Sequence, residues 1–335
     1  GVIRAGDILG ETADKKALAA VALAGLPTPP ESGKVSIGIS TTALSPRELR
    51  DIGKQLKQLY IDKFSKRPRI VYPQTGTLLN AGHLEGNRLL TPPNCELFFI
   101  KGRDNWLVGK TSWQQDIASY TQRDRGRPAR DARVGMLPPK LAQSMLNLAG
   151  VNDKSHVHDP FCGTGVILTE ALLKKGNVSG SDASPEMVHA TKTNLAWMQQ
   201  LSGHPSVDFE VFEADAQTVT LPASTTHIVS EGYLGNPDLR EDSHARLVEE
   251  ARTLLPLYKH FFQNIARYSS PLVIVFALPV WFSSTNSAPI TLPILDDLPD
   301  MGYTVEQFAP DSATTLIYRR PHQTVGRAII KLRKG

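Results

Sequence analysis

The segment around residue 160 places an acid and two closely spaced glycines between a run typical of a strand and one typical of a helix. Such glycines let the backbone turn tightly and approach a ligand, and the helix start offers free N–H groups. No Gly-Lys-Ser/Thr follows, which excludes a Walker A loop, and Leu168 replaces the third glycine of a dinucleotide loop. The acid precedes the glycines, where it can meet the charged amine of an amino-acid-like ligand. The loop reads Asp159-Pro160-Phe161-Cys162-Gly163-Thr164-Gly165.

Two further acids follow the next two expected strands. Asp182 comes 17 residues after Gly165, where a carboxylate can accept hydrogen bonds from ribose hydroxyls, and Asp215 could accept one from an adenine amine. An Asp at a strand end is often only a helix cap, so each acid alone says little. Because parallel strands end in one crevice, the three acids together indicate S-adenosyl-L-methionine as cofactor. The expected cofactor-binding residues are Asp159, Phe161, Cys162, Gly163, Thr164, Gly165, Asp182, Ala183, Asp215 and Ala216.

Alternating strands and helices must position these residues. Strand-like runs occur at 156–159, 177–182, 207–214, 227–230 and 272–278, with helices expected at 166–175, from Ser184-Pro185, and at 243–268. After Met301 only strands are expected, at 303–308, 315–318 and 325–332. This order predicts an α/β fold, a Rossmann-like and mostly parallel sheet covered on both faces and closed by an antiparallel C-terminal hairpin.

The first third of the chain predicts a smaller α+β unit. Its expected elements are a strand at 34–40, a helix from Ser45-Pro46 to about Ser65, and strands at 69–72, 96–101 and 106–110. Residues 1–34 read as a short strand, a helix over 14–24 and a Pro-rich connection, and residues 116–133 read as a polar, Arg-rich linker.

The positive charge is unevenly distributed. The net charge is +4, yet residues 47–69 carry +5, residues 121–140 carry +4 and residues 319–334 carry +6. Such clusters favour a basic surface that binds nucleic acid, although each could simply solvate a helix. The expected RNA-binding residues are Arg50, Lys54, Lys57, Lys66, Arg67, Arg69, Arg123, Arg125, Arg127 and Arg130.

Composition excludes several other classes of protein. With 41% hydrophobic and 21% charged residues the chain is globular, and no apolar run reaches the ~18 residues that a membrane span needs. The two cysteines, Cys95 and Cys162, have no metal-ligand spacing, which fits a reducing compartment, and we expect a cytoplasmic location without membrane contact. The chain has neither a leader nor a starting Met, so we expect a trimmed chain.

The glycine loop resembles motif I of class I methyltransferases that modify the exocyclic amine of guanine in tRNA. One family is indicated more specifically, the archaeal and eukaryotic tRNA guanosine-10 N2-methyltransferases. The segment before the loop, the polar stretch from Tyr120 to Pro128 and the closing Arg320-Pro321 and Val325-Gly326-Arg327 all resemble that family. The segment before the loop reads Arg133-Val134-Gly135-Met136-Leu137-Pro138-Pro139-Lys140-Leu141-Ala142.

The resemblance covers about residues 34–332 and implies a division of the chain. Residues 34–114 are similar to a THUMP RNA-binding domain, which implies that they anchor the acceptor end of tRNA. Residues 1–33 would be the remnant of a ferredoxin-like part, 115–137 an Arg-rich linker and 138–335 the methyltransferase domain. The resemblance also implies that Asp159, Gly163 and Gly165 flank the methionine part of the cofactor, Asp182 the ribose, and Asp215 with Ala216 the adenine.

The family's catalytic loop, Asp-Pro-Pro-Tyr after the fourth strand, is altered in this chain. The matching residues, Ser230, Glu231, Gly232 and Tyr233, are the expected catalytic residues. Methylation of a guanine amine requires an acceptor for the amine hydrogen and an aromatic face for the flipped base. Glu231 is the carboxylate available as acceptor, aided by main-chain carbonyls around Ser230 and Gly232, and Tyr233 supplies the face.

The expected function is therefore transfer of a methyl group to the N2 amine of a guanosine in tRNA, at position 10. Methylation of another RNA nucleotide or of adenine in DNA, and a tRNA-binding protein impaired in transfer, remain alternatives. The number of methyl groups added and the need for a small activating subunit stay open. Cys162 has no neighbouring base and is expected to pack rather than react. His156 and His158 are expected on opposite faces of a strand and are therefore not expected to share a metal.

Overall fold

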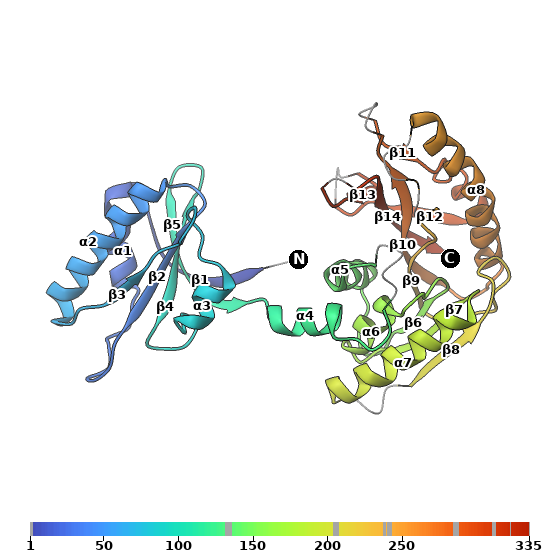
Figure 1. Cartoon of the computed structure of the whole chain (residues 1–335). Coiled ribbons are helices and arrows are strands. Elements are labelled where there is room, and N and C mark those ends of the chain that lie inside the picture. The colour runs from blue at the N-terminus through green and yellow to red at the C-terminus, as the bar shows by residue number, and fades with distance from the viewer. Residues whose placement is uncertain are drawn as a thin grey trace. The chain divides into compact units, whose positions relative to one another are not determined.

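The computed structural model describes residues 3–130, 136–203, 208–236, 239, 243–283, 288–309, 313–321 and 323–334. The chain forms two compact units, residues 1–118 and 119–335, each with its own sheet (Figure 1). No helix of the described residues is both long enough and apolar enough to cross a membrane.

The N-terminal unit is a five-stranded mixed sheet with helices. Its strand order is β1 (Arg4–Thr12), β5 (Trp106–Gln114), β4 (Cys95–Lys101), β2 (Ser36–Thr41) and β3 (Arg69–Val71). β2 runs parallel to β3 and β4, whereas β5 is antiparallel to both β4 and β1. Helices α1 (Leu18–Ala24) and α2 (Pro46–Phe64) share one core with the sheet, and the short α3 (Ala81–Gly86) belongs to a second, smaller cluster.

Helix α2 begins where the sequence predicts. The Ser45 side chain accepts from the Glu48 backbone N–H and the Glu48 carboxylate accepts from the Ser45 N–H, which makes a capping box, with Pro46 in the first turn. Its apolar face, which includes Leu49 and Leu56, is buried in the core of the unit and leaves the basic face of the helix toward solvent.

The division of the N-terminal part differs from the expected one. β1 pairs along its length with β5, and α1 contributes Leu18 and Leu23 to the core that also holds α2. The strand and helix of residues 4–24 are therefore integral to the same sheet and core as residues 34–114, rather than a separate remnant. A short 3₁₀ turn, Lys15–Ala17, precedes α1.

The segment expected as a linker, residues 115–137, contains helix α4 (Ile117–Arg125). Two of its arginines, Arg123 and Arg127, are buried, so this segment is partly integrated into folded structure rather than an extended polar connection. Residues 131–135, which include Arg133 of the family-like segment, lie outside the described residues.

The C-terminal unit confirms the expected α/β fold. Five parallel strands run in the order β10 (Leu272–Trp281), β9 (His227–Glu231), β6 (His156–Asp159), β7 (Asn177–Asp182) and β8 (Phe209–Glu213). Strand β14 (Val325–Lys334) pairs antiparallel with β10 and is the expected antiparallel addition. The outer strands β12 (Tyr303–Glu306) and β13 (Thr315–Tyr318) pair with β14, and β11 (Ile290–Thr291) pairs with β10.

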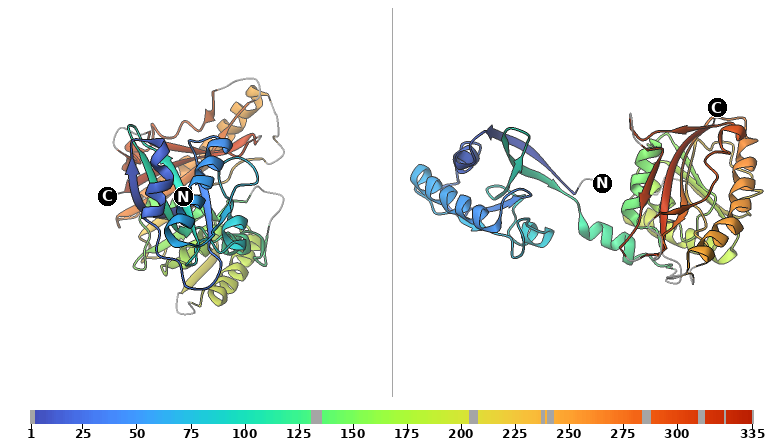
Figure 2. Two further views of the ribbon diagram at one scale, coloured as in Figure 1. Left: turned by 90° about the vertical axis from the view of Figure 1, so that its left-hand side faces the viewer. Right: turned by 90° about the horizontal axis from the view of Figure 1, so that it is seen from above.

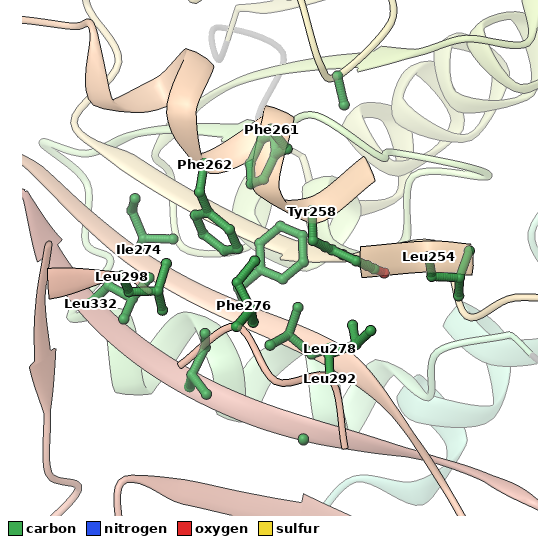
Figure 3. Packing of buried hydrophobic residues seen from close by; sticks show 14 of the residues in the cluster. Leu254, Tyr258, Phe261, Phe262, Ile274, Phe276, Leu278, Leu292, Leu298 and Leu332 are labelled. Carbon is green, nitrogen blue, oxygen red and sulfur yellow. The ribbon is translucent and has the colours of Figure 1, made fainter. Parts of the chain in front are cut away.

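Helices cover both faces of this sheet (Figures 1 and 2). Helices α5 (Pro139–Ala149), α6 (Val166–Leu172) and α7 (Pro185–Ser202) enclose one core, and α8 (His244–Ala266) with the turn Pro299–Met301 helps to enclose the other. Phe261 and Phe262 of α8 pack on Phe276 of β10, with ring centroids 5.3 and 5.5 Å from it (Figure 3). These two cores fix the carboxyl ends of β6, β7 and β9 relative to one another.

Candidate active site

The glycine loop connects β6 to α6 as expected. Gly163 and Gly165 adopt positive φ values of +51° and +78°, which favour glycine. A Cβ on Gly165 would lie 2.9 Å from the Thr191 side chain, so that position also lacks room for a larger residue. The Thr191 hydroxyl donates to the Gly163 carbonyl over 2.7 Å, and together these features hold the loop in a single tight turn.

Asp182 fastens the glycine loop to the end of β7. Its two carboxylate oxygens accept one bond each, from the backbone N–H groups of Gly163 and Ser184, both over 2.9 Å. Each oxygen keeps capacity for a further donor, because a carboxylate oxygen can accept two. Asp215, after β8, accepts from the N–H of Gln217 over 2.9 Å and is exposed.

A cavity of about 640 Å³ lies where these strand ends meet. The expected cofactor and catalytic residues line it, with the exceptions of Gly165, which starts α6, and Ser230, which is fully buried. The cavity therefore brings together, from the predicted set, Asp159, Phe161, Cys162, Gly163, Thr164, Asp182, Ala183, Asp215, Ala216, Glu231, Gly232 and Tyr233.

The Asp159 carboxyl is buried at the end of β6. Its Oδ1 accepts from the Ser230 hydroxyl over 2.6 Å and from the Phe161 N–H over 3.2 Å. Burial raises the pKa of Asp159 to about 7, although both hydrogen bonds act in the opposite direction. A cation beside this carboxyl would favour its ionised form, so the site is suited to an ammonium group.

Glu231 ends β9 and forms an ion pair that sequence reasoning did not anticipate. Its Oε1 accepts from Arg327 Nε over 2.6 Å, and the Arg327 side chain is only 4% exposed. Burial raises the pKa of Glu231, and the charge and hydrogen bond of Arg327 lower it in part. A carboxylate acceptor therefore lies on the cavity wall, next to Tyr233, whose side chain is 49% exposed.

Aromatic side chains support the loop that carries Tyr233. The Tyr258 hydroxyl donates to the Tyr233 carbonyl over 2.5 Å, and the Phe161 ring packs edge-on against Phe276, 5.9 Å between centroids. A Cβ on Gly232 would lie 2.6 Å from the Tyr258 hydroxyl and 2.7 Å from the Phe276 ring. Gly232 is therefore required for the loop to lie this close to the aromatic core.

Several functional candidates were missed or left open by the sequence. Asn194 of α7 donates to the carbonyls of Thr164 and Ala129, and its buried amide carries no local pattern that would reveal this. Met136 and Leu137, from the segment before the glycine loop, line the cavity. Further lining residues that the sequence reasoning did not single out are Val166, Ile167, Glu186, Met187, Gln217, Leu234 and Leu257.

The structure describes the surroundings of Cys162 and of the two histidines of β6. Cys162 is buried, and burial raises the pKa of its thiol well above the ordinary value, which disfavours a nucleophile. His156 and His158 each contact the Ser179 hydroxyl, at 2.9 and 2.8 Å, so the two rings lie on the same face of β6 and the expected placement on opposite faces is wrong. Within the described part of the chain, no three His, Cys, Asp or Glu side chains are grouped so that they could hold a metal.

The expected RNA-binding residues divide into exposed and buried sets. The exposed set in the N-terminal unit consists of Arg50, Lys54, Arg67 and Arg69. In the C-terminal unit, Arg125 and Arg130 are exposed. Lys57 is half-buried, and Lys66 donates to the carbonyls of Pro30 and Glu31.

Two of those expectations are corrected. Arg123 is 8% exposed and pairs with the buried Glu170 over 2.6 Å, and Arg127 is 3% exposed and contacts Met136. Both guanidinium groups are used inside the C-terminal unit, so neither presents its charge to RNA. Charge composition could not distinguish them from Arg125, because it does not tell which side chains pack inside the unit.

The C-terminal basic cluster is also largely engaged within the unit. Lys331 and Arg333 both pair with Glu306, and Arg327 pairs with Glu231. Arg319 and Arg320 are exposed, with the Arg319 guanidinium 4.1 Å from the Phe282 ring centroid.

The segment that forms the cavity is similar to known proteins. Residues 127–278 match the family model described as RMKL-like, methyltransferase domain. A tRNA (guanine(10)-N2)-dimethyltransferase of Methanothermobacter thermautotrophicus is 40% identical over 101 residues, 30% of this chain and 28% of that protein. The protein of the same name from Methanocaldococcus jannaschii is 41% identical over 106 residues, 32% of this chain and 30% of that protein. The matches thus span less than a third of each relative.

Solved structures agree on the fold. TrmN from Thermus thermophilus aligns over 99% of this chain and 82% of its own, with a TM-score of 0.53 and 18% identity. A predicted N6-adenine-specific DNA methylase from Listeria monocytogenes aligns over 98% of this chain and 82% of its own, with a TM-score of 0.51 and 12% identity. At these identities the likeness shows the class I methyltransferase fold and nothing about substrate.

Proposed function

We propose that this chain is an S-adenosyl-L-methionine-dependent tRNA methyltransferase that modifies the exocyclic N2 of a guanosine, at position 10. The observation that carries the proposal is the cavity shared by three acidic strand ends, a glycine loop, and the Glu231 and Tyr233 side chains. The short stretches of identity to proteins named for guanosine 10 supply the substrate and the position.

The residues at the glycine loop fit the cofactor chemically. Asp159 would meet its ammonium group, Asp182 keeps lone pairs for the ribose hydroxyls, and Asp215 with Ala216 would border the adenine. A Cβ on Gly163 would meet no protein atom within 4 Å, so the loop leaves open space beside a ligand. A cavity of about 640 Å³ is in the range of small-molecule sites.

The reaction would require Glu231 and Tyr233 to act on the flipped base. The cofactor supplies a methyl group bonded to a sulfonium sulfur, which makes its carbon electrophilic. Transfer forms the N2–carbon bond, leaves the S–C electron pair on sulfur and releases one N2 proton. Glu231 would accept that hydrogen, and Tyr233 would hold the base against its ring. Ser230 would act indirectly, through its bond to Asp159.

The N-terminal unit is proposed to be the THUMP-like RNA-binding module, and tRNA the macromolecular partner. Support comes from the exposed Arg50 and Lys54 on α2 and Arg67 and Arg69 after it. This assignment rests on the sequence resemblance and on charge.

The test is methyl transfer from labelled S-adenosylmethionine to an unmodified tRNA transcript, followed by nucleoside analysis. We expect label in N2-methylated guanosine, and none when position 10 carries inosine, which lacks only the N2 amine. Glu231→Gln should lower the rate about 100-fold or more while cofactor binding persists. Label in another nucleoside would overturn the substrate, and intact cofactor and tRNA binding without transfer would overturn the activity.

A further inference from the structure

The altered catalytic loop is held by contacts from elements far apart in the sequence. The Ser230 hydroxyl binds Asp159, and the Tyr258 hydroxyl binds the Tyr233 carbonyl. The Gly232 N–H donates to the Ala277 carbonyl of β10 over 3.1 Å. Residues 230–235 contain no proline to stiffen the loop, so these three hydrogen bonds define its geometry. A fourth contact, the ion pair between Glu231 and Arg327, holds the side chain proposed to meet the substrate amine.

The ion pair between Glu231 and Arg327 crosses a strand. Strand β10 lies between β9, which carries Glu231, and β14, which carries Arg327 (Figure 1). Arg327 lies two residues from Ile329, and Glu231 two residues from Val229, so each charged side chain shares a strand face with its apolar neighbour. Both apolar residues belong to the core under α5 to α7, so the two charges lie on that same face of the sheet. Ala277 is the β10 partner of Glu231 and Pro279 is the β10 partner of Arg327, so the ion pair runs diagonally across β10.

The ion pair leaves part of the Glu231 carboxylate available. Arg327 Nε binds Oε1, and among the described residues no hydrogen bond is made to Oε2. The Glu231 side chain is 18% exposed and lines the cavity. A carboxylate with one fixed oxygen and one open oxygen has a defined orientation toward a bound amine.

The charge of Arg327 opposes the effect of burial on Glu231. Burial raises the pKa of this carboxyl, while Arg327 and, more weakly, Arg320 lower it. Tyr258 and Asp159 also face Glu231, since its charge raises the pKa of each. Without the guanidinium the carboxyl would keep its proton to a higher pH, and a protonated acid cannot accept one from the amine.

We propose that Arg327 is a positioning residue that keeps Glu231 ionised and orients its open oxygen toward the methyl-accepting nitrogen. This inference rests on the proposed methyl transfer. Arg327 does not itself touch the reacting atoms, so its contribution should be visible in the state of Glu231 rather than in cofactor binding.

The first test compares Arg327→Gln and Arg327→Lys with the unaltered chain in methyl transfer as a function of pH. Arg327→Gln should lower kcat about 100-fold at neutral pH and move the acid limb of the kcat profile to higher pH, so that alkaline buffer restores part of the rate. Arg327→Lys keeps the charge without the planar guanidinium and should recover at least about 10-fold of that loss. KM for S-adenosylmethionine should stay within about twofold.

Two comparisons separate positioning from a structural role. Lys331→Gln removes another β14 cation, one paired with Glu306 over 2.9 Å, and should leave the profile in place. Glu231→Gln combined with Arg327→Gln should be no slower than Glu231→Gln alone, because both act through one group. A uniform rate loss at every pH, or additive losses in the double variant, would overturn the inference.

A second measurement does not depend on activity. The ¹³C resonance of the Glu231 carboxyl, assigned by its loss in Glu231→Gln, should titrate at higher pH in Arg327→Gln than in the unaltered chain. An unchanged titration would overturn the role of Arg327 even if methyl transfer is observed. Absence of transfer in the unaltered chain, with the titration shifted, would instead count against the proposed function alone.

Discussion

At the scale of single residues, the burial of Asp159 has a measurable consequence for ligand binding. Its pKa is raised to about 7, so at pH 6 most of the free protein carries a proton there. A cationic amine bound beside it would favour the ionised form. We therefore expect S-adenosylhomocysteine binding to release roughly 0.9 proton at pH 6 and few at pH 8, and affinity to rise between these values.

Calorimetry in two buffers of different ionisation enthalpy measures this proton release. Asp159→Asn should abolish it and weaken binding, whereas Asp182→Asn should weaken binding and retain it. The same carboxyl affects folding with a definite sign. Its folded pKa lies above the ordinary 3.8, so its contribution to the unfolding free energy should fall as pH rises from about 4 to 7. Binding without proton release at pH 6 would contradict this role for Asp159.

Tyr233 is the residue expected to contact the target base. Its side chain is 49% exposed at the cavity, and its backbone is held by Tyr258, so the ring is presented without being packed. Tyr233→Ala should lower kcat/KM for tRNA by about 10- to 100-fold, because a stacked base loses its platform. Tyr233→Phe keeps the ring and should stay within about threefold. Equal losses in both variants would point to the hydroxyl instead of the face.

At the scale of elements, much of the fold was predictable because local patterns and global packing agree. Strands in the C-terminal unit were located by apolar runs between turns, and α2 by its cap at Ser45. The acids Asp159 and Asp182 could be grouped in one site because parallel strands place their carboxyl ends at one edge. The ion pair between Glu231 and Arg327 could not be predicted from the sequence, because it joins residues on two strands that a third strand separates.

The arginines of α4 show the limit of reasoning from charge. Arg123 is a buried partner of Glu170, while Arg125, two positions on, is exposed. Helix geometry turns neighbouring residues to different faces, and composition cannot say which face packs. One arginine of the expected basic surface thus forms a buried ion pair, Arg123–Glu170, inside the unit.

The contribution of the Arg123–Glu170 ion pair to the free energy of unfolding can be measured. Arg123→Ala leaves Glu170 buried without its ion-pair partner and should lower the unfolding free energy by about 3–5 kcal/mol. Arg125→Ala, on the exposed side of the same helix, should change it by less than about 0.5 kcal/mol. Urea unfolding followed by circular dichroism measures both. Similar values for the two variants would mean that the ion pair contributes little beyond helix propensity.

At the scale of the whole molecule, the net charge of +4 does not tell which basic residues form internal ion pairs and which remain exposed. Arg327 pairs with Glu231, and Lys331 and Arg333 share Glu306. The exposed cations that remain for a polyanion include those of α2 and the turn that follows it. The structure therefore narrows the proposed RNA surface to fewer side chains than the sequence indicates.

Neutralising that surface should weaken tRNA binding without affecting the cofactor site. In the full chain, Arg50, Lys54 and Arg67 are changed together to Gln. We expect weaker binding at low salt and a log K against log salt slope reduced by roughly one for each phosphate that the variant no longer neutralises. A matched variant changes Lys154, Lys174 and Lys175, which lie in turns before β6 and β7, at the end of the sheet opposite the cavity.

The matched variant removes the same charge and should keep the salt slope. Nitrocellulose filter binding at several salt concentrations measures tRNA affinity, and calorimetry with S-adenosylhomocysteine reports whether the cavity is intact. An unchanged slope in the first variant would exclude the α2 surface from phosphate binding. Equal reductions in both variants would mean that tRNA responds to the net charge of the molecule rather than to this surface, because only a defined interface depends on where the charges lie.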